Sequence, residues 1–332
     1  MLQYHIASGT ASLLCREWGE GDPLVLLHGN GENSLYFEKQ FDLFSRYFRV
    51  ITVDSRGHGG STHGEEGLSI ALMAEDVLAV LDALGIERAH LLGFSDGGNI
   101  ALSFALRWPE RVGKLILNGA NIRMRAGVVP WATVPVHLSW GALGMLSRFN
   151  RRAAQKRDVL GLMVNDYGVT FEDLGWIKAE TLVIVGERDL IRAEETDRIT
   201  AALPNVQRVT IPGADHFCAA KAPHRFNLAV LKFLLAKKET IPEEKPLEKM
   251  VVSELEKLME TLELSETEEE GMKEYKLVYL NKGFKASREK DLEQSQNAIN
   301  EQIEQGWNLQ QIVSPNDMVG ALVGVFYREK EE

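Results

Sequence analysis

Short apolar runs alternate with helical patterns along the first two thirds of the chain. The runs cover residues 24–27, 50–53, 90–92, 115–117, 181–185 and 208–211. Between them, Ile70 to Leu84 places apolar residues at helical spacing, and Gly98 to Arg107 has the pattern of a second helix. Strands that are buried on both faces are apolar throughout in this way. The alternation therefore predicts an α/β protein with a mainly parallel sheet flanked by helices.

The alternation stops before residues 121–178 and resumes at Thr181, which predicts a short helical cap above the sheet. Within this stretch, Ala126 to Ser147 contains no Lys, Arg, Asp or Glu and is long enough to cross a bilayer. Pro130 and Pro135 break its apolar pattern, so we interpret it as a lid and not as a transmembrane segment. Binding of substrate acyl chains and ordinary packing of the cap both explain its apolar residues.

The character of the chain changes after residue 238, where we expect the first domain (residues 1–238) to end. Residues 239–272 are predicted to form an acidic linker with an amphipathic helix. Glu243 to Glu270 holds eleven Glu and three Lys, which accounts for −8 of the net charge of −11. Residues 273–332 are predicted to form a small α+β domain of order β-α-β-β. Residues 240–332 are the candidate segment for a protein partner or for self-association.

Composition excludes several classes of protein. No basic stripe is interleaved with aromatic residues, so nucleic acid is not an expected partner. Cys15 and Cys218 are too few for a disulfide framework, and no positively charged and then apolar leader precedes the first strand-like segment. We therefore expect a cytoplasmic protein without a transmembrane segment.

Ser95 is the candidate nucleophile. Residues 93–97, Gly-Phe-Ser-Asp-Gly, fit the pattern G-x-S-x-G and lie directly between an expected strand and an expected helix, which is the context that this motif requires. The glycines let the chain turn sharply enough to lift the Ser95 hydroxyl above the sheet. The N-terminus of the helix then favours the negative charge that develops there.

A serine nucleophile needs a base, and the base needs a group that orients it. Asp189 follows the strand at residues 181–185, and His216 follows the next strand, so both are expected at the same edge of the sheet as Ser95. The chain order Ser, Asp, His agrees with a nucleophile of this kind. Glu187 and Asp215 are alternative acids, although one lies inside the strand-exit turn and the other directly beside the base.

Backbone N–H groups are expected to hold the oxyanion. Residues 28–31, His-Gly-Asn-Gly, end the first apolar run, and their glycines let main-chain N–H groups approach a substrate oxygen. We expect the donors to be the N–H of Asn30 and the N–H of Asp96, directly after the nucleophile. A tight turn without a donor role is the alternative for Asn30. For the Asp96 carboxylate, stabilisation by the helix dipole and recognition of a cationic substrate group are both open.

Two other kinds of site are not indicated. Asp54 to Ser61 is rich in glycine but lacks the pattern G-x-x-x-x-G-K-[ST], so we interpret it as a structural turn and not as a phosphate-binding loop. No grouping of histidine, cysteine and carboxylate residues shows metal-ligand spacing. The sequence therefore predicts neither a cofactor nor a metal.

Together these motifs resemble those of the α/β-hydrolase superfamily, over roughly residues 1–238. The segments that carry the resemblance are His28-Gly29, residues 54–59, residues 93–98, residues 186–189 and residues 213–217. The resemblance implies a cofactor-free hydrolase that forms an acyl-enzyme. Lys273 to Arg328 resembles a small bacterial domain of unknown function with a Gly-Trp motif, here Gly306 and Trp307, which implies no activity.

We therefore expect a carboxylesterase-like serine hydrolase of small ester-like substrates. In this hypothesis Ser95 is the nucleophile, His216 the base and Asp189 the orienting acid. A C–C bond hydrolase, a thioesterase or a perhydrolase on the same triad is one alternative. A non-catalytic sensor or scaffold protein with the α/β-hydrolase fold is the other.

Overall fold

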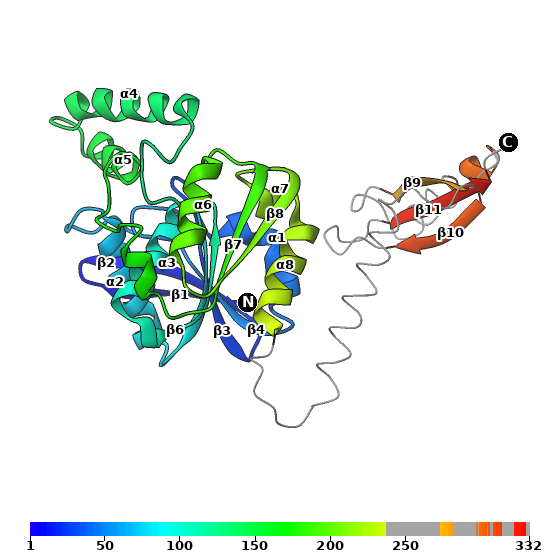
Figure 1. Cartoon of the computed structure of the whole chain (residues 1–332), viewed down its shortest axis with the longest axis horizontal. Helices are drawn as coiled ribbons and strands as arrows, with labels where there is room; N and C mark the ends of the chain where they lie inside the picture. Colours follow the sequence, from blue (N-terminus) through cyan, green and yellow to red (C-terminus); the bar gives the residue numbers. More distant parts are fainter. Residues whose placement is uncertain are drawn as a thin grey trace. The chain divides into compact units, whose positions relative to one another are not determined.

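The structure of the protein is a computed structural model, and it describes residues 1–236, 273–281, 297, 299–303, 305, 308–313 and 322–329. The contacts within the chain divide it into two compact units, Met1–Ile241 and Pro242–Glu332. Figure 1 shows the first unit as a central sheet with helices on both of its faces.

The first unit is built on an eight-stranded sheet with the strand order β1-β2-β4-β3-β5-β6-β7-β8. The strands are β1 (Leu2–Ser8), β2 (Ala11–Trp18), β3 (Asp22–Leu27), β4 (Phe48–Val53), β5 (Ala89–Phe94), β6 (Val112–Asn118), β7 (Thr181–Arg188) and β8 (Val206–Asp215). β1 and β2 pair antiparallel with their neighbours, and the strands from β4 to β8 in this order are parallel. The predicted mainly parallel sheet is confirmed, and the parallel strands are those that the apolar runs indicated.

Helices cover both faces of this sheet. They are α1 (Glu38–Phe44), α2 (Ile70–Ala83), α3 (Asp96–Arg107), α6 (Ala193–Ala202), α7 (Cys218–Lys221) and α8 (Pro223–Leu235), with 3-10 turns η1 (Ser34–Phe37) and η2 (Pro109–Arg111). In β3, Leu24 and Leu26 face the core that contains α1 and α8, whereas Val25 and Leu27 face the core that contains α2 and α3. Successive strand residues point to opposite faces, so a strand between two helical layers must be apolar throughout.

Local chemistry sets the ends of α2. The hydroxyl of Ser69, just before the helix, accepts a hydrogen bond from the N–H of Leu72 at 3.1 Å. This cap satisfies one of the N–H groups that the first helical turn leaves without an intrahelical partner. After the helix, Gly85 adopts a φ of 64°, the left-handed conformation in which helices often end.

The cap between β6 and β7 consists of α4 (Pro130–Leu146), α5 (Arg151–Gly161) and the 3-10 turn η3 (Asp173–Trp176). Pro135, which interrupts the apolar pattern of this stretch, lies inside α4, and the helix continues through it. Proline removes one backbone hydrogen bond, and residues on both sides can still stay helical. Within the described residues, no helix is both long enough and apolar enough to span a membrane.

In the second unit the described strands form one antiparallel sheet with the order β10-β11-β9. These strands are β9 (Lys273–Asn281), β10 (Asn308–Val313) and β11 (Leu322–Glu329). The helix expected in the acidic linker, and the Gly306-Trp307 motif, lie outside the described residues.

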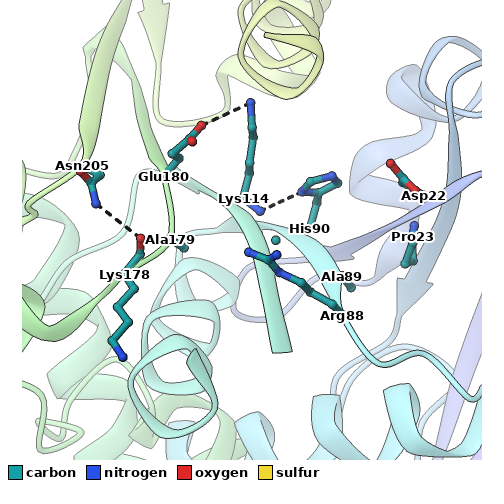
Figure 2. A pocket seen from close by; sticks show the side chains of 11 residues that line it. Asp22, Pro23, Arg88, Ala89, His90, Lys114, Lys178, Ala179, Glu180 and Asn205 are labelled. Atoms are coloured by element: carbon teal, nitrogen blue, oxygen red, sulfur yellow. Dashed lines mark hydrogen bonds and ion pairs between the residues drawn. The ribbon is translucent and has the colours of Figure 1, made fainter. Parts of the chain in front are cut away.

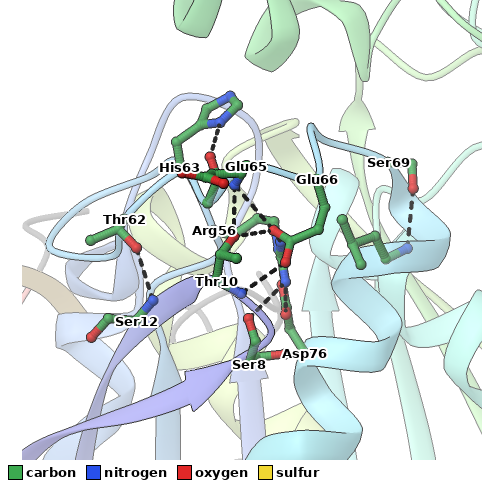
Figure 3. A network of polar contacts seen from close by, with 12 residues as sticks. Ser8, Thr10, Ser12, Arg56, Thr62, His63, Glu65, Glu66, Ser69 and Asp76 are labelled. Atoms are coloured by element: carbon green, nitrogen blue, oxygen red, sulfur yellow. Dashed lines mark hydrogen bonds and ion pairs between the residues drawn. The ribbon is translucent and has the colours of Figure 1, made fainter.

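The turn after β4 is held by buried polar groups. Asp54 accepts hydrogen bonds from the backbone N–H of Ser34 at 2.9 Å and of Gly60 at 2.8 Å. Figure 3 shows Arg56 between Asp76 of α2 and Glu66, to which it is joined by ion pairs. The Nε of Arg56 donates to Asp76 at 2.7 Å, and both side chains are buried. These contacts agree with the interpretation of residues 54–61 as a structural turn, because they attach this segment to its neighbours in the fold.

We expect Asp76→Ala to lower the free energy of unfolding by about 3–5 kcal/mol, because it leaves the buried Arg56 guanidinium without its main counter-charge. Urea unfolding followed by circular dichroism measures the change. The matched control is Asp82→Ala on the same helix, where an exposed carboxylate pairs with Arg111 at 2.7 Å. That change should cost about 1 kcal/mol or less. Equal losses for the two variants would contradict a special role for the buried pair.

Candidate active site

Ser95 occupies the turn between β5 and α3. Its φ is 53° and its ψ is −119°, and among the described residues it alone has a positive φ without being glycine. Its backbone N–H donates to the carbonyl oxygen of Asn118 at the end of β6, at 2.8 Å. A side chain in this conformation costs of order 1–3 kcal/mol, and such strain is concentrated at functional sites.

The neighbouring glycines make this turn possible. A Cβ atom at Gly97 would overlap the carbonyl oxygen of Leu27 at the end of β3, and one at Gly93 would overlap the backbone of Gly97. The start of α3 can therefore approach the sheet closely only with glycine at both positions. This packing holds Ser95 at the carboxyl edge of the parallel strands.

His216 and Asp189 meet at the same edge. Nδ1 of His216, directly after β8, lies 2.7 Å from Oδ1 of Asp189, which follows β7, and both side chains are almost fully buried. Oδ1 of Asp189 also accepts the backbone N–H of Ile191 at 2.9 Å. A carboxylate held in this way fixes the orientation of an imidazole ring and its tautomer.

Contacts on the other side of the imidazole ring link His216 to the serine turn. The ring of Phe94, directly before Ser95, lies 4.8 Å from the ring of His216, measured between centroids. Gly119 lies so close to the His216 ring that a Cβ atom there would overlap it. The residue before it is Asn118, whose carbonyl oxygen accepts the hydrogen bond from the N–H of Ser95. The structure therefore brings Ser95, Asp189 and His216 to one part of the sheet edge.

The two alternative acids make other contacts. Glu187 accepts the backbone N–H of Gly213 at 2.7 Å. Asp215 accepts the N–H of Phe217 at 3.0 Å and forms an ion pair with Lys221. Of these acids, the structure places Asp189 against the His216 ring.

Asn30 and Asp96 follow β3 and β5, which are adjacent parallel strands with Leu27 opposite Gly93. Among the described residues, the backbone N–H groups of Asn30 and Asp96 have no hydrogen-bond partner. The side chain of Asn30 donates to the Asp96 carboxylate at 2.9 Å and to the carbonyl oxygen of Val159 in α5 at 2.7 Å. The contact with Val159 joins this loop to the cap.

Comparison with known proteins identifies the family of this chain. Residues 22–160 match the sequence profile of a family described as the alpha/beta hydrolase fold. A 2-hydroxy-6-oxononadienedioate/2-hydroxy-6-oxononatrienedioate hydrolase of Paraburkholderia phymatum is 34% identical over 253 residues, which cover 64% of this chain and 87% of that protein. The chain belongs to the α/β-hydrolase family.

Two solved structures are similar to this hydrolase. The esterase RhEst1 from Rhodococcus sp. ECU1013 has a TM-score of 0.60 and 26% identity, over 70% of this chain and 98% of that one. Est816, described as an N-acyl homoserine lactone degrading enzyme, has a TM-score of 0.59 and 27% identity, over 69% of this chain and 100% of that one.

Two carboxyl groups near His216 have perturbed pKa values. Burial raises the pKa of Asp96 to about 6, although hydrogen bonds from Asn30 and Asn99 and the charge of His216 oppose the shift. Burial also raises the pKa of Glu32 to about 7, and its Oε2 is buried without a hydrogen-bond partner among the described residues. We did not predict Glu32 from the sequence, where its only signal is an acid directly after the His-Gly-Asn-Gly turn.

A large cavity lies at the opposite edge of the sheet. Its volume is about 630 Å³, and it is lined by residues at the amino ends of the parallel strands, among them Arg88, Lys114 and Glu180 (Figure 2). Lys114 donates to the carbonyl oxygens of Phe233 and Ala236 and forms an ion pair with Glu180, so its ammonium group already has partners within the protein. Ligands of open α/β sheets bind at the carboxyl ends of the strands, so the edge that carries Ser95 is the candidate active site.

We expect Asp96→Asn to stabilise the hydrolase near neutral pH but not in acid. The pKa of Asp96 is about 6 in the fold and about 3.9 in an unfolded chain, so ionisation penalises folding as the pH rises through this interval. Asparagine cannot ionise and still accepts the hydrogen bond from Asn30. The gain should be at most about 3 kcal/mol at about pH 7 and close to zero near pH 4. Urea unfolding at several pH values measures it, and a gain that does not vary with pH would contradict the assignment.

Proposed function

We propose that this protein is a serine hydrolase that cleaves small ester-like substrates through an acyl-enzyme. The observation that carries the proposal is the strained turn at Ser95, combined with the His216–Asp189 hydrogen bond at the same sheet edge. A fold that did not use the serine hydroxyl would gain nothing from a non-glycine residue with this φ. This strain supports an active enzyme over a non-catalytic sensor or scaffold.

The proposed reaction begins with attack of the Ser95 hydroxyl on the substrate carbonyl. Because Nδ1 of His216 faces Asp189, Nε2 is the nitrogen that takes the Ser95 proton, and the Asp189 carboxylate stabilises the imidazolium that results. The backbone N–H groups of Asn30 and Asp96 hold the negatively charged oxygen of the tetrahedral intermediate.

The leaving group then departs with the proton from His216. This step leaves an acyl group on Ser95. Water attacks the acyl carbon, His216 takes a proton from that water, and the acid product leaves while Ser95 regains its proton.

Two carboxyl groups near His216 would oppose a dicarboxylate substrate in their ionised forms. Asp96 and Glu32 lie close enough to His216 for their pKa values to depend on its charge, and both pKa values are raised by burial. Negatively charged substrate groups would be repelled by these carboxylates when they ionise. Neutral esters carry no such cost, and the similarity to esterase structures supports them.

Hydrolysis of a C–C bond is the second candidate. It is favoured by the 34% identity to the 2-hydroxy-6-oxononadienedioate/2-hydroxy-6-oxononatrienedioate hydrolase. The name of that substrate describes a dicarboxylate, whose charges Asp96 and Glu32 would repel when they are ionised.

We also propose that the reaction takes place in the cytoplasm. Cys15 and Cys218 are buried free thiols, and burial raises the pKa of each to about 12. Such thiols do not react readily, and they agree with a reducing, cytoplasmic environment. A role of residues 240–332 in binding a partner or in self-association stays a prediction from the sequence.

We expect Ser95→Ala to lower hydrolysis of a short p-nitrophenyl ester by at least about 10³-fold, because the acyl-enzyme cannot form. A panel of an ester, a thioester, an amide and a 2-hydroxy-6-oxo-dienoate identifies the bond that the wild type cleaves. Cleavage of the dienoate alone would favour the second candidate. Full esterase activity in Ser95→Ala would rule out the proposed nucleophile.

We expect Asp189→Asn to lower kcat by about 10⁴-fold, because an amide no longer holds the reactive tautomer of His216. Asp215→Asn is the matched control, since this exposed acid pairs with Lys221 and does not contact the His216 ring. Its effect should stay within about threefold. Steady-state kinetics on the best ester of the panel measures both, and the reverse order of effects would assign the orienting role to Asp215.

A further inference from the structure

The cap helix α4 exposes its apolar side to solvent. Thr133 is the one residue of this helix that is buried. The large apolar side chains that it and the turn after it expose are Trp131 (72%), Val134 (54%), Leu138 (71%), Met145 (70%), Leu146 (59%) and Phe149 (92%). A helix on the surface of a globular protein normally turns its apolar side to the core, so this orientation requires an explanation.

These exposed side chains form one stripe. Trp131, Val134, Leu138 and Met145 follow one another at intervals of three, four and seven residues, which places them on one side of the helix. No Lys, Arg, Asp or Glu occurs between Ala126 and Ser147. We call Trp131, Val134, Leu138, Met145, Leu146 and Phe149 the α4 stripe.

The α4 stripe does not face the catalytic residues. α5 is the helix that contacts the Asn30 loop, through the hydrogen bond from Asn30 to Val159, and its Asp158 lies 3.2 Å from Nε2 of His63. α4 packs on α5, where the guanidinium of Arg157 lies 4.5 Å from the ring of Trp140. Figure 1 shows α4 at the outer edge of the first unit, with α5 between it and the sheet. Binding of acyl chains in the active site therefore does not account for the stripe.

A group of basic residues continues the α4 stripe. Arg148, Arg151, Arg152 and Lys156 are exposed, and no acidic partner for any of them is present among the described residues. No acid occurs between Ala126 and Arg157, and the first one after them, Asp158, pairs with His63. This end of the cap therefore combines a large apolar surface with unpaired positive charge.

We propose that the α4 stripe and these basic residues bind the surface of an anionic lipid bilayer. A helix that lies in the interface buries Trp, Leu and Phe at the boundary between headgroups and acyl chains, while nearby Lys and Arg bind anionic headgroups. α4 lacks the length to cross the bilayer and lies in the plane of the interface. The positive charges favour lipid over a second copy of this chain, whose own α4 surface would bring like charges together.

Sedimentation of the full-length protein with unilamellar vesicles tests this proposal. We expect binding to phosphatidylcholine vesicles that contain about 30% phosphatidylserine, much weaker binding to phosphatidylcholine alone, and release as ionic strength rises from about 0.1 to about 0.5 M. The double variant Leu138→Glu/Met145→Glu should lower the partition coefficient at least about tenfold. Arg151→Gln/Arg152→Gln should lower it by roughly 10- to 30-fold.

The controls are Leu2→Glu and Arg46→Gln, which change an exposed apolar residue and an exposed base outside the cap. Both should bind within about twofold of the wild type. All the substituted side chains are exposed, so we expect every variant to be folded. Circular dichroism checks this. Failure of the wild type to bind the anionic vesicles, or equal losses in the controls, overturns the proposal. A second result would also overturn it: the wild type does not bind vesicles but forms a dimer in sedimentation velocity, and Leu138→Glu/Met145→Glu dissociates that dimer.

Discussion

The geometry of the site depends on the turn that carries Ser95. A residue with a side chain is held at a φ of 53° between β5 and α3. The turn is possible because Gly93 and Gly97 let the start of α3 lie directly against the backbone at the end of β3. The same contact brings the loop of Asn30 beside Asp96, and the bond from Ser95 to Asn118 fixes the neighbouring strand end. Packing energy from the sheet and its helical layers stabilises the strained residue.

The carboxyl groups around this turn lie in different environments. Asp189 is paired with His216 and accepts a backbone N–H, whereas Glu32 and Asp96 have pKa values raised by burial. Environments that move the pKa values of neighbouring groups apart are common at catalytic sites. Here they make the charge next to His216 depend on pH near neutrality, which bears on the substrates that the site can accept.

Local patterns in the sequence were sufficient to predict the sheet and the presence of a helical cap, but not how the cap packs. Residues such as Leu24 and Val25 predicted a strand with two buried faces, because the periodicity of a strand appears directly in the sequence. Pro135 was used only as evidence against a transmembrane segment, and α4 continues through it. The exposure of the α4 stripe depends on how α4 packs on α5. No local pattern contains that information.

The sequence also limited what could be predicted of the site. Ser95, Asp189 and His216 were placed by their strand exits, which parallel topology brings to one edge. Glu32 was not predicted because its raised pKa arises from burial by the fold. For the Asp96 carboxylate the sequence left the helix dipole and a cationic substrate group open, and it did not indicate the hydrogen bond from Asn30. Burial and long-range contacts depend on the whole fold, so they cannot be predicted from a short stretch of sequence.

The reactivity of Ser95 is the central claim, and covalent labelling with a fluorophosphonate tests it most directly. Such a probe reacts with a serine hydroxyl that a neighbouring base activates. Intact-mass measurement followed by peptide mapping should show one adduct per chain, located on Ser95, and none after unfolding in urea. An unlabelled protein, or an adduct on another residue, would contradict the account.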